Sequence, residues 1–275
     1  MAKKNKINKT DVDVLKKDLG IEQINAFPGD ISLKYEKTQH KLVMTLTKEA
    51  AGFVKKGKNY INMQDTRACF EAWCLIIKAK TSNPGLKIEL DVKGITVASY
   101  SDKRPDNGHL GRFLYRILKF SEQYKQWFEL SPILEVLKNN FKNYLALPGV
   151  KFFTSAPKNE PKKDIANCNL ESYVEYLFCD SISAQKDILN LPIRTTIDRQ
   201  LPVSLFEGSS GGGNEVFTRQ KSAIDFWALD GDTINVYELK SDNPMVGIIT
   251  EIFFYSNYVH DVFISKSLYH GKGCV

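Results

Sequence analysis

The stretch of residues 222–240, SAIDFWALDGDTINVYELK, decides how we interpret the second half of the chain. Residues 223–229 alternate imperfectly between apolar and other residues, and residues 234–240 are again rich in residues that favour strands. Between them, Asp230-Gly231-Asp232 is a strong signal for a tight turn. The stretch therefore predicts two antiparallel strands that form a β-hairpin.

Three charged residues hold unusual positions in this hairpin. Asp225 lies inside an apolar run, and Glu238 and Lys240 close the second strand with one residue between them. Because side chains alternate along a strand, Glu238 and Lys240 face one side while Leu239 faces the other. Pairing across the turn brings Asp225 to the same end of the neighbouring strand. Two carboxylates and an ammonium group are therefore predicted to converge on one patch of the sheet.

Such a patch can support metal-dependent chemistry. Mg²⁺ prefers carboxylate oxygens and usually keeps water ligands that a substrate phosphate can replace. A lysine beside the metal can orient or deprotonate the attacking water, or stabilise the charge on the phosphate. The alternative is a cross-strand salt bridge on a solvated face, which is the commoner meaning of an isolated Asp…Glu-x-Lys set.

The order of Asp225, a turn, Glu238-Leu239-Lys240 and a following helix resembles the PD-(D/E)XK nuclease superfamily, over roughly the last third of the chain. The resemblance implies that Asp225 and Glu238 bind Mg²⁺ or Mn²⁺, with the backbone carbonyl of Leu239 completing the set of ligands. It also implies that Lys240 positions or activates the attacking water. The implied fold is a restriction-endonuclease-like αβββαβ core, a mixed sheet flanked by helices.

The elements predicted for the last third follow that order. A helix over residues 169–180 precedes three strands, which are predicted over residues 201–206, 216–229 and 234–240. A second helix follows over residues 247–263. The final strand has only weak candidates, at residues 262–265 and 267–269, and the chain stops soon afterwards. We therefore expect a core that is truncated at its C-terminus.

Both predicted helices carry residues that the resemblance marks as supporting ones. Superfamily members often supply a further carboxylate from the first helix, and Glu171 or Glu175 can fill that catalytic role. Glu175 is preferred because aromatic residues flank it. Glu251 and Tyr255 on the second helix resemble the Gln-x-x-x-Tyr pattern of the RecB-like branch, with Glu in place of Gln. The alternatives are exposed glutamates on the first helix and a polar edge on a packed second helix.

The first half of the chain predicts a separate α+β domain over residues 1–153. Alternating apolar residues predict one hairpin over residues 30–37 and 41–48 and another over residues 86–92 and 95–97. Helices are also predicted over residues 65–80, 110–128 and 131–147, the first of them capped by Asp65. A polar linker rich in Pro and Lys follows over residues 154–167, and the nuclease-like domain spans residues 168–275.

The charge of the chain is divided unevenly between these halves. Residues 1–165 hold 30 Lys and Arg against 18 Asp and Glu, whereas residues 166–275 hold 8 against 14. A basic half suits attraction to a polyanion, and an acidic half suits the binding of metal ions. We therefore expect nucleic acid, in particular DNA, as the partner.

Five basic side chains are candidates for contacts with nucleic acid: Arg112, Arg116, Lys119, Arg199 and Arg219. The first three lie close together on one predicted helix, where a phosphate-binding strip competes with a merely solvated helix face. Arg199 and Arg219 are among the few cations of the second half. For these two we expect phosphate contacts near the metal.

Composition sets the broad class of the protein. A content of 43% hydrophobic and 25% charged residues is ordinary for a globular protein. No apolar run is long enough for a membrane helix, and the basic N-terminus lacks the apolar stretch of a secretory signal. The five cysteines have no zinc spacing, which favours reduced thiols. We expect a cytoplasmic protein that does not bind membranes.

The sequence as a whole predicts an α/β protein that is a Mg²⁺-dependent nuclease, with DNA endonuclease as the preferred activity. One alternative is a non-catalytic protein that binds nucleic acid or another partner and retains the nuclease-like fold. Another is a different kind of enzyme built on a similar sheet. The oligomeric state also stays open, with a homodimer among the possibilities.

Overall fold

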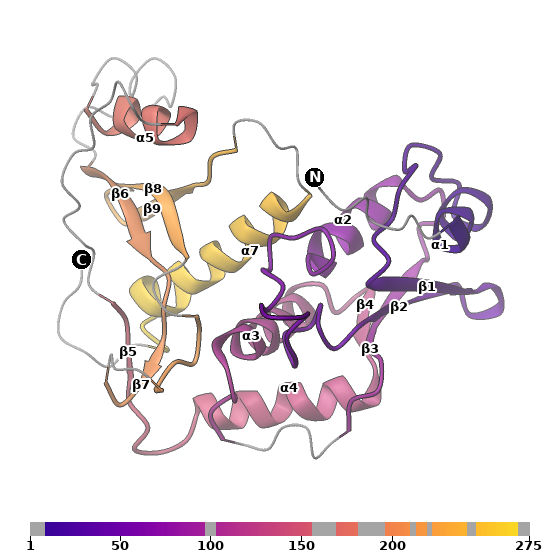
Figure 1. Ribbon diagram of the computed structural model, residues 1–275, viewed down its shortest axis with the longest axis horizontal. Coiled ribbons are helices and arrows are strands. Elements are labelled where there is room, and N and C mark those ends of the chain that lie inside the picture. Colours follow the sequence, from indigo (N-terminus) through magenta and orange to yellow (C-terminus); the bar gives the residue numbers. More distant parts are fainter. Residues whose placement is uncertain are drawn as a thin grey trace. The chain divides into compact units, whose positions relative to one another are not determined.

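The computed structural model describes residues 9–96, 103–155, 169–180, 196–209, 213–218, 222–240 and 246–268. These residues form both helices and sheets, as expected of a mixed α/β protein (Figure 1). The chain divides into two compact units. Unit 1 comprises Met1–Gly149 and Met245–Thr250, and unit 2 comprises Val150–Pro244 and Glu251–Val275.

Unit 1 contains a four-stranded sheet in the order β1-β2-β3-β4. Its strands are β1 (Ile31–Glu36), β2 (Lys41–Leu46), β3 (Lys87–Val92) and β4 (Phe128–Leu130). The first two pair antiparallel, which confirms the hairpin predicted from alternation, and Leu42, Met44 and Leu46 of β2 are buried. On the edge strand β1, the backbone N–H of Leu33 donates a hydrogen bond to Asp11 Oδ1 at 2.8 Å.

The described helical segments of unit 1 are α1 (Lys9–Asp13), the π-helix η1 (Val14–Asp18), the 3-10 helix η2 (Lys37–Gln39), α2 (Phe70–Lys80), α3 (Gly108–Gln123) and α4 (Pro132–Leu145). Helix α3 begins where the side chain of Asn107 accepts hydrogen bonds from the N–H groups of His109 and Leu110, as a capping residue does. Helix α4 has proline at its first position, as predicted.

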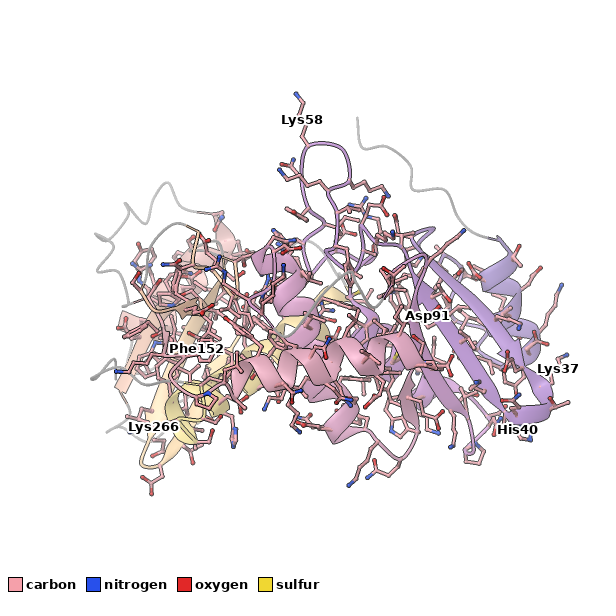
Figure 2. All side chains as sticks on the ribbon, turned by 90° about the horizontal axis from the view of Figure 1, so that it is seen from below. Lys37, His40, Lys58, Asp91, Phe152 and Lys266 are labelled. Atoms are coloured by element: carbon pink, nitrogen blue, oxygen red, sulfur yellow. The ribbon has the colours of Figure 1, made fainter. Side chains whose placement is uncertain are left out.

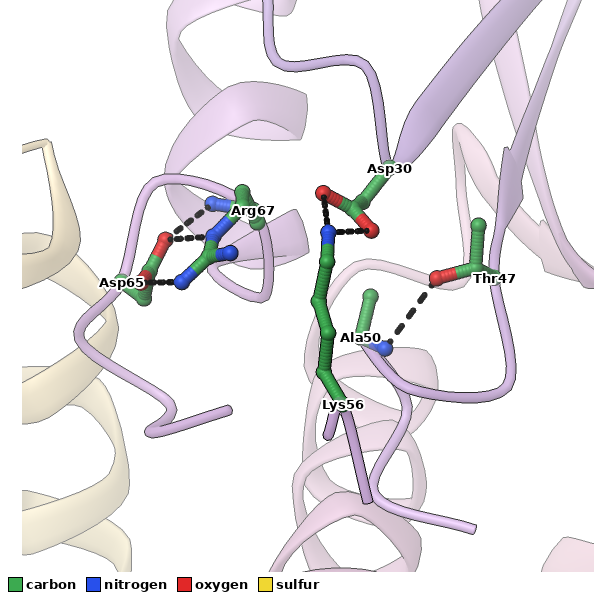
Figure 3. A network of polar contacts seen from close by, with 6 residues as sticks. All are labelled: Asp30, Thr47, Ala50, Lys56, Asp65 and Arg67. Carbon is green, nitrogen blue, oxygen red and sulfur yellow. Dashed lines mark hydrogen bonds and ion pairs between the residues drawn. The ribbon is translucent and has the colours of Figure 1, made fainter. Parts of the chain in front are cut away.

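Three predictions for unit 1 are wrong in detail. The predicted helix over residues 110–128 stops at Gln123, and Phe128 lies instead in β4, where it pairs with Ile88 of β3. The second predicted hairpin is absent from the described residues, since β3 pairs in parallel with both β2 and β4. Asp65 does not cap a helix: it binds the backbone and side chain of Arg67, and α2 starts later, at Phe70 (Figure 3).

Unit 2 contains a three-stranded antiparallel sheet in the order β6-β8-β9. Its strands are β6 (Thr196–Pro202), β8 (Ala223–Asp230) and β9 (Thr233–Tyr237), and a separate short pair joins β5 (Phe152–Phe153) to β7 (Phe206–Glu207). The helices are α5 (Leu170–Asp180) and α7 (Gly247–Val259), the latter continued by the π-helix η5 (His260–Ile264). The first turn of α7 belongs to unit 1 and the remainder to unit 2.

Aromatic stacking joins α5 to the sheet of unit 2. Phe178 of α5 stacks on Phe226 of β8 with ring centroids 5.4 Å apart, and Phe226 stacks on Tyr237 of β9 at 4.5 Å. Phe226 and Tyr237 are partners across the hairpin, so both rings lie on one face of the sheet. Asp225, its immediate neighbour in β8, has the opposite parity along the strand.

The elements of unit 2 depart from prediction mainly at their ends. The strand expected over residues 201–206 is split, because β6 ends at Pro202 and β7 begins at Phe206. The described part of residues 216–229 is a strand only from Ala223 onward, and β9 ends before Glu238. The candidates for a last strand are not strands where they are described, since residues 262–264 are π-helical. Tyr269 lies outside the described residues.

The division of the chain also differs slightly from the predicted domains. Phe152 and Phe153 pair with β7, so they belong to unit 2 rather than to the first half. Most of the predicted linker, residues 156–167, lies outside the described residues. None of the described helices is both long and apolar enough to cross a membrane. Among the described cysteines, Cys69, Cys74 and Cys179 are free thiols.

Candidate functional site

The site begins where β9 separates from β8. Phe226 pairs with Tyr237, the last residue of β9, so the same register sets Asp225 opposite Glu238. Beyond Tyr237 the backbone N–H of Leu239 donates to Asp225 Oδ2 at 2.6 Å. The side chain of Asp225 thus supplies the acceptor at the point where the regular ladder of the hairpin ends.

Lys240 joins the carboxylates of two separate elements. Its Nζ lies 2.6 Å from Glu238 Oε1 and 3.3 Å from Glu251 Oε2, the latter on α7. The side chains of Glu238 and Glu251 are only 5% and 6% exposed, while that of Lys240 is 19% exposed. Ion pairs shielded from water to this degree are strong, but they carry a large cost of desolvation.

Glu238 lacks a hydrogen-bond partner among the described residues for one of its two carboxyl oxygens. Its Oε2 is buried and has no hydrogen-bond partner among the residues that the structure describes. Burial raises the pKa of Glu238 to about 8, helped by repulsion from Glu251 and Asp225 and opposed by Lys240. Near neutral pH the carboxyl therefore holds a proton, which it can share with Asp225 or Glu251.

The pKa values of the groups around Glu238 are shifted as well, because negative charge is in excess there. Burial raises the pKa of Asp225, against the opposing effects of the Leu239 N–H and of Lys240. Burial likewise raises the pKa of Glu251, again opposed by Lys240. Burial alone would lower the pKa of Lys240, but its bond to Glu238 and the nearby acids raise it. Three carboxyl groups thus share one ammonium group, an arrangement that favours uptake of a proton or a further cation.

A second cluster connects α5 to β6. Glu175 is buried, and its Oε2 accepts a hydrogen bond from Gln200 Nε2 at 3.0 Å and lies 3.9 Å from Arg199 Nη1. The guanidinium of Arg199 also lies 3.9 Å from the centre of the Tyr176 ring. Burial raises the pKa of Glu175, opposed by Gln200 and aided by Asp225. Glu175 is therefore close enough to Asp225 to respond to its charge.

Gln200 is a residue of the site that the sequence did not reveal. Its φ angle is 54°, in the left-handed region, although it lies within strand β6. The pairs on either side of it, Arg199 with Phe226 and Leu201 with Ile224, set it opposite Asp225. Glutamine has no special preference for this conformation, so no pattern in the sequence could have found it.

The predicted site residues of unit 2 differ in how close they lie to Lys240. The contacts above bring five of them together directly: Asp225, Glu238, Leu239, Lys240 and Glu251. Glu175 lies beside them, and Glu171 is near enough to raise the pKa of both Glu175 and Asp225. Tyr255 is buried one turn after Glu251 and contacts the ring of Phe254, and Arg219 lies outside the described residues.

The basic strip predicted on α3 requires a correction. Arg112 and Arg116 are 3% and 2% exposed, so they form neither a phosphate-binding strip nor a solvated helix face. Arg116 makes a two-pronged ion pair with Glu71 and donates to the carbonyl of Ala68, whereas Arg112 contacts His109. These guanidinium groups belong to the core of unit 1. Lys119 is half-buried, with its Nζ over the ring of Tyr115.

Comparison with known protein families, curated proteins and solved structures finds no match. Within the described part of the chain, no three His, Cys, Asp or Glu side chains converge tightly enough to hold a metal ion by themselves. A hard cation would therefore need Asp225, Glu238 and oxygens of another kind. The orphaned Oε2 of Glu238 and the hard carboxylate donors fit Mg²⁺ or Mn²⁺, which readily complete their shells with carbonyl, water or phosphate oxygens.

Proposed function

We propose that unit 2 is a nuclease that hydrolyses phosphodiester bonds with the help of Mg²⁺ or Mn²⁺, and that DNA is its substrate. One observation carries the proposal: Asp225, Glu238 and Lys240 meet at the end of a hairpin, with Glu238 Oε2 buried and without a partner. A buried, unsatisfied carboxylate in a cluster with excess negative charge is costly unless it takes up a proton or a further positively charged ligand.

Asp225 and Glu238 are the residues that would hold the cation, with the backbone carbonyl of Leu239 as a further ligand. When bound, a divalent cation supplies Lewis acidity, which polarises a phosphoryl oxygen and lowers the pKa of a water ligand. Glu238 must release its proton to act as a ligand. Because its pKa is raised to about 8, cation and proton compete for it near neutral pH.

Lys240 supplies positive charge rather than a base. Its raised pKa keeps the amine protonated, so it suits the stabilisation of developing charge on a phosphate better than the removal of a proton. Glu175 is a further carboxyl with a raised pKa, which suits the acceptance or donation of a proton. Arg199 contacts both Glu175 and Tyr176, and it is the cation of this cluster that would meet a phosphate beside the carboxylates.

Unit 1 supplies a basic surface suited to a polyanion. The loop around Gly57 exposes Lys55, Lys56 and Lys58, and Lys58 extends outward at its tip (Figure 2). Lys56 is bound to Asp30 at 2.6 Å, which leaves Lys55 and Lys58 as the better candidates for phosphate contacts (Figure 3). Contacts of this kind give affinity for nucleic acid without selecting its sequence.

The test is cleavage of a supercoiled plasmid by the full chain in Mg²⁺, in Mn²⁺ and in chelator. The wild type should produce nicked or linear DNA with either metal and none in chelator. Glu238→Gln should abolish the cut, while the matched control Glu207→Gln, on β7, should not alter it. If no nucleic acid is cut with either metal, the nuclease proposal is wrong.

A specific observation favours one alternative. Lys240 already binds Glu238 and Glu251, so the cluster can also serve as a purely structural network of charges. The protein would then be a non-catalytic binder of nucleic acid or of another partner. In that case Mn²⁺ titration would detect no binding to the wild type, and duplex binding would not depend on metal.

A further inference from the structure

The ammonium group of Lys240 has two carboxylate partners that come from different elements. Glu238 follows strand β9, whereas Glu251 lies in helix α7. The shorter contact, 2.6 Å, is to Glu238, and the longer one, 3.3 Å, is to Glu251. All three residues belong to unit 2. The ammonium group is therefore shared between the two carboxylates. It lies closer to Glu238, the carboxylate that the proposed cation would also use.

A cation held by Asp225 and by the free Oε2 of Glu238 would share the Glu238 carboxylate with Lys240, which binds Oε1. Two cations a few ångströms apart repel strongly in a site that is shielded from water. Lys240 must then either swing out toward solvent or bind another carboxylate. Glu251 already contacts it and is itself buried, so Lys240 can stay without a rearrangement of the backbone.

We infer that Glu251 is a positioning residue that retains the Lys240 ammonium group in the site when a divalent cation takes up Glu238. The inference rests on the proposed function and adds to it a residue that keeps Lys240 in the site once the cation is bound. Glu251 touches neither the cation nor the substrate in this scheme. It acts through Lys240, which stays charged and in place for the phosphate.

The test is a double-mutant cycle on the full chain with Mn²⁺ alone as the probe, measured by calorimetric titration. The four proteins are the wild type, Glu251→Gln, Lys240→Ala and the double variant. Glu251→Gln should weaken Mn²⁺ binding about tenfold in the wild-type background, because Lys240 then has only Glu238 as a partner. In the Lys240→Ala background the same substitution should weaken binding by less than about threefold. Glu207→Gln is the matched control and should leave the affinity unchanged.

The outcomes separate the two proposals. Equal losses in both backgrounds would mean that Glu251 acts only as a nearby charge, and would overturn the inference alone. Absence of Mn²⁺ binding by the wild type would overturn the proposed function and the inference with it. If Glu251→Gln fails to fold, Glu251→Asp replaces it, since it keeps the charge but shortens the reach. Unchanged affinity in Glu251→Asp would also contradict a positioning role.

Discussion

The carboxylate of Asp225 accepts a hydrogen bond from the backbone N–H of Leu239 at 2.6 Å, two residues after strand β9 has ended. One side chain therefore has two tasks. It holds the end of the hairpin in place, and it contributes a half-buried carboxylate beside Glu238. The two tasks can be separated by substitution, because an amide can accept the hydrogen bond but cannot carry the charge.

We expect Asp225→Ala to be less stable than Asp225→Asn by about 1–3 kcal/mol, the cost of leaving the Leu239 N–H without an acceptor. Both variants should lose affinity for Mn²⁺. Urea denaturation measures the stability and calorimetric titration the affinity, with Asp230→Asn at the exposed turn as the control. Equal stability of the two variants would mean that the hydrogen bond contributes little.

The raised pKa of Glu238 predicts how stability depends on pH. Between its ordinary value of 4.5 and about 8, the folded chain holds a proton that the unfolded chain has released. The free energy of unfolding should therefore fall as pH rises through this window, by an amount on the order of a few kcal/mol, and then level off. Urea denaturation at a series of pH values measures the slope, which Glu238→Gln should reduce and Mg²⁺ should counteract. A profile that is the same in Glu238→Gln would contradict the assignment.

Lys240→Ala should separate metal binding from catalysis. Its affinity for Mn²⁺ should not fall, because an ammonium group is not a ligand and competes for Glu238. Its rate of plasmid nicking should fall by about 10²–10³, the usual effect of removing one electrostatic contact to the transition state. Lys151→Ala, in the same unit, serves as the control. Cleavage by Lys240→Ala at close to the wild-type rate would identify Lys240 as a structural counter-ion.

The buried pair of Arg116 and Glu71 should matter for folding and not for binding. Arg116→Ala should lower the free energy of unfolding by about 3–5 kcal/mol, because it leaves the Glu71 carboxylate buried without its partner. Joint replacement, Arg116→Met with Glu71→Leu, should recover most of that loss. The exposed charge pairs of unit 1 offer a contrast, and Lys34→Ala should change stability by less than about 1 kcal/mol. Thermal and urea denaturation measure the stability of all three variants against that of the wild type.

Binding of the full chain to duplex DNA should weaken steeply with salt, and Lys55 and Lys58 should account for part of the slope. Replacing both by alanine should reduce the slope of log K against log salt by up to about 2. Lys34 and Lys37 provide a matched control, since they carry the same charge but are paired with Glu36 and Asp18. Fluorescence anisotropy at several salt concentrations measures both. If the two double variants behave alike, the loop around Gly57 is not a preferred contact.

The elements that the sequence predicted best are those that adjacent residues identify without any partner elsewhere in the chain. Alternation of Leu42, Met44 and Leu46 found strand β2, and proline at position 132 found the start of α4. Strand β4 was missed because its first residue, Phe128, continues the apolar spacing of the preceding helix. Only its partner in β3, about 40 residues away in the chain, makes Phe128 part of a strand.

Within the site, only contacts between residues close together in the chain were predictable. Glu238 and Lys240 are two residues apart, so an extended chain sets both side chains on the same side, and the structure brings them into contact although β9 ends at Tyr237. Burial of Arg116 was not predictable, because the partner that neutralises it, Glu71, lies on another helix. Gln200 was not predictable either, since glutamine has no preference for a left-handed backbone and its partner Glu175 lies 25 residues away in the chain.

The hydrogen bond from Leu33 to Asp11 has a consequence for association between copies of the chain. Strand β1 is the edge of its sheet, and an open edge can recruit a strand from another molecule. The carboxylate of Asp11 occupies the position that an incoming strand would use at Leu33. A second copy that added a strand to β1 would have to displace it. Asp11 therefore blocks strand addition along β1 at Leu33, and we expect no dimer that forms through this edge.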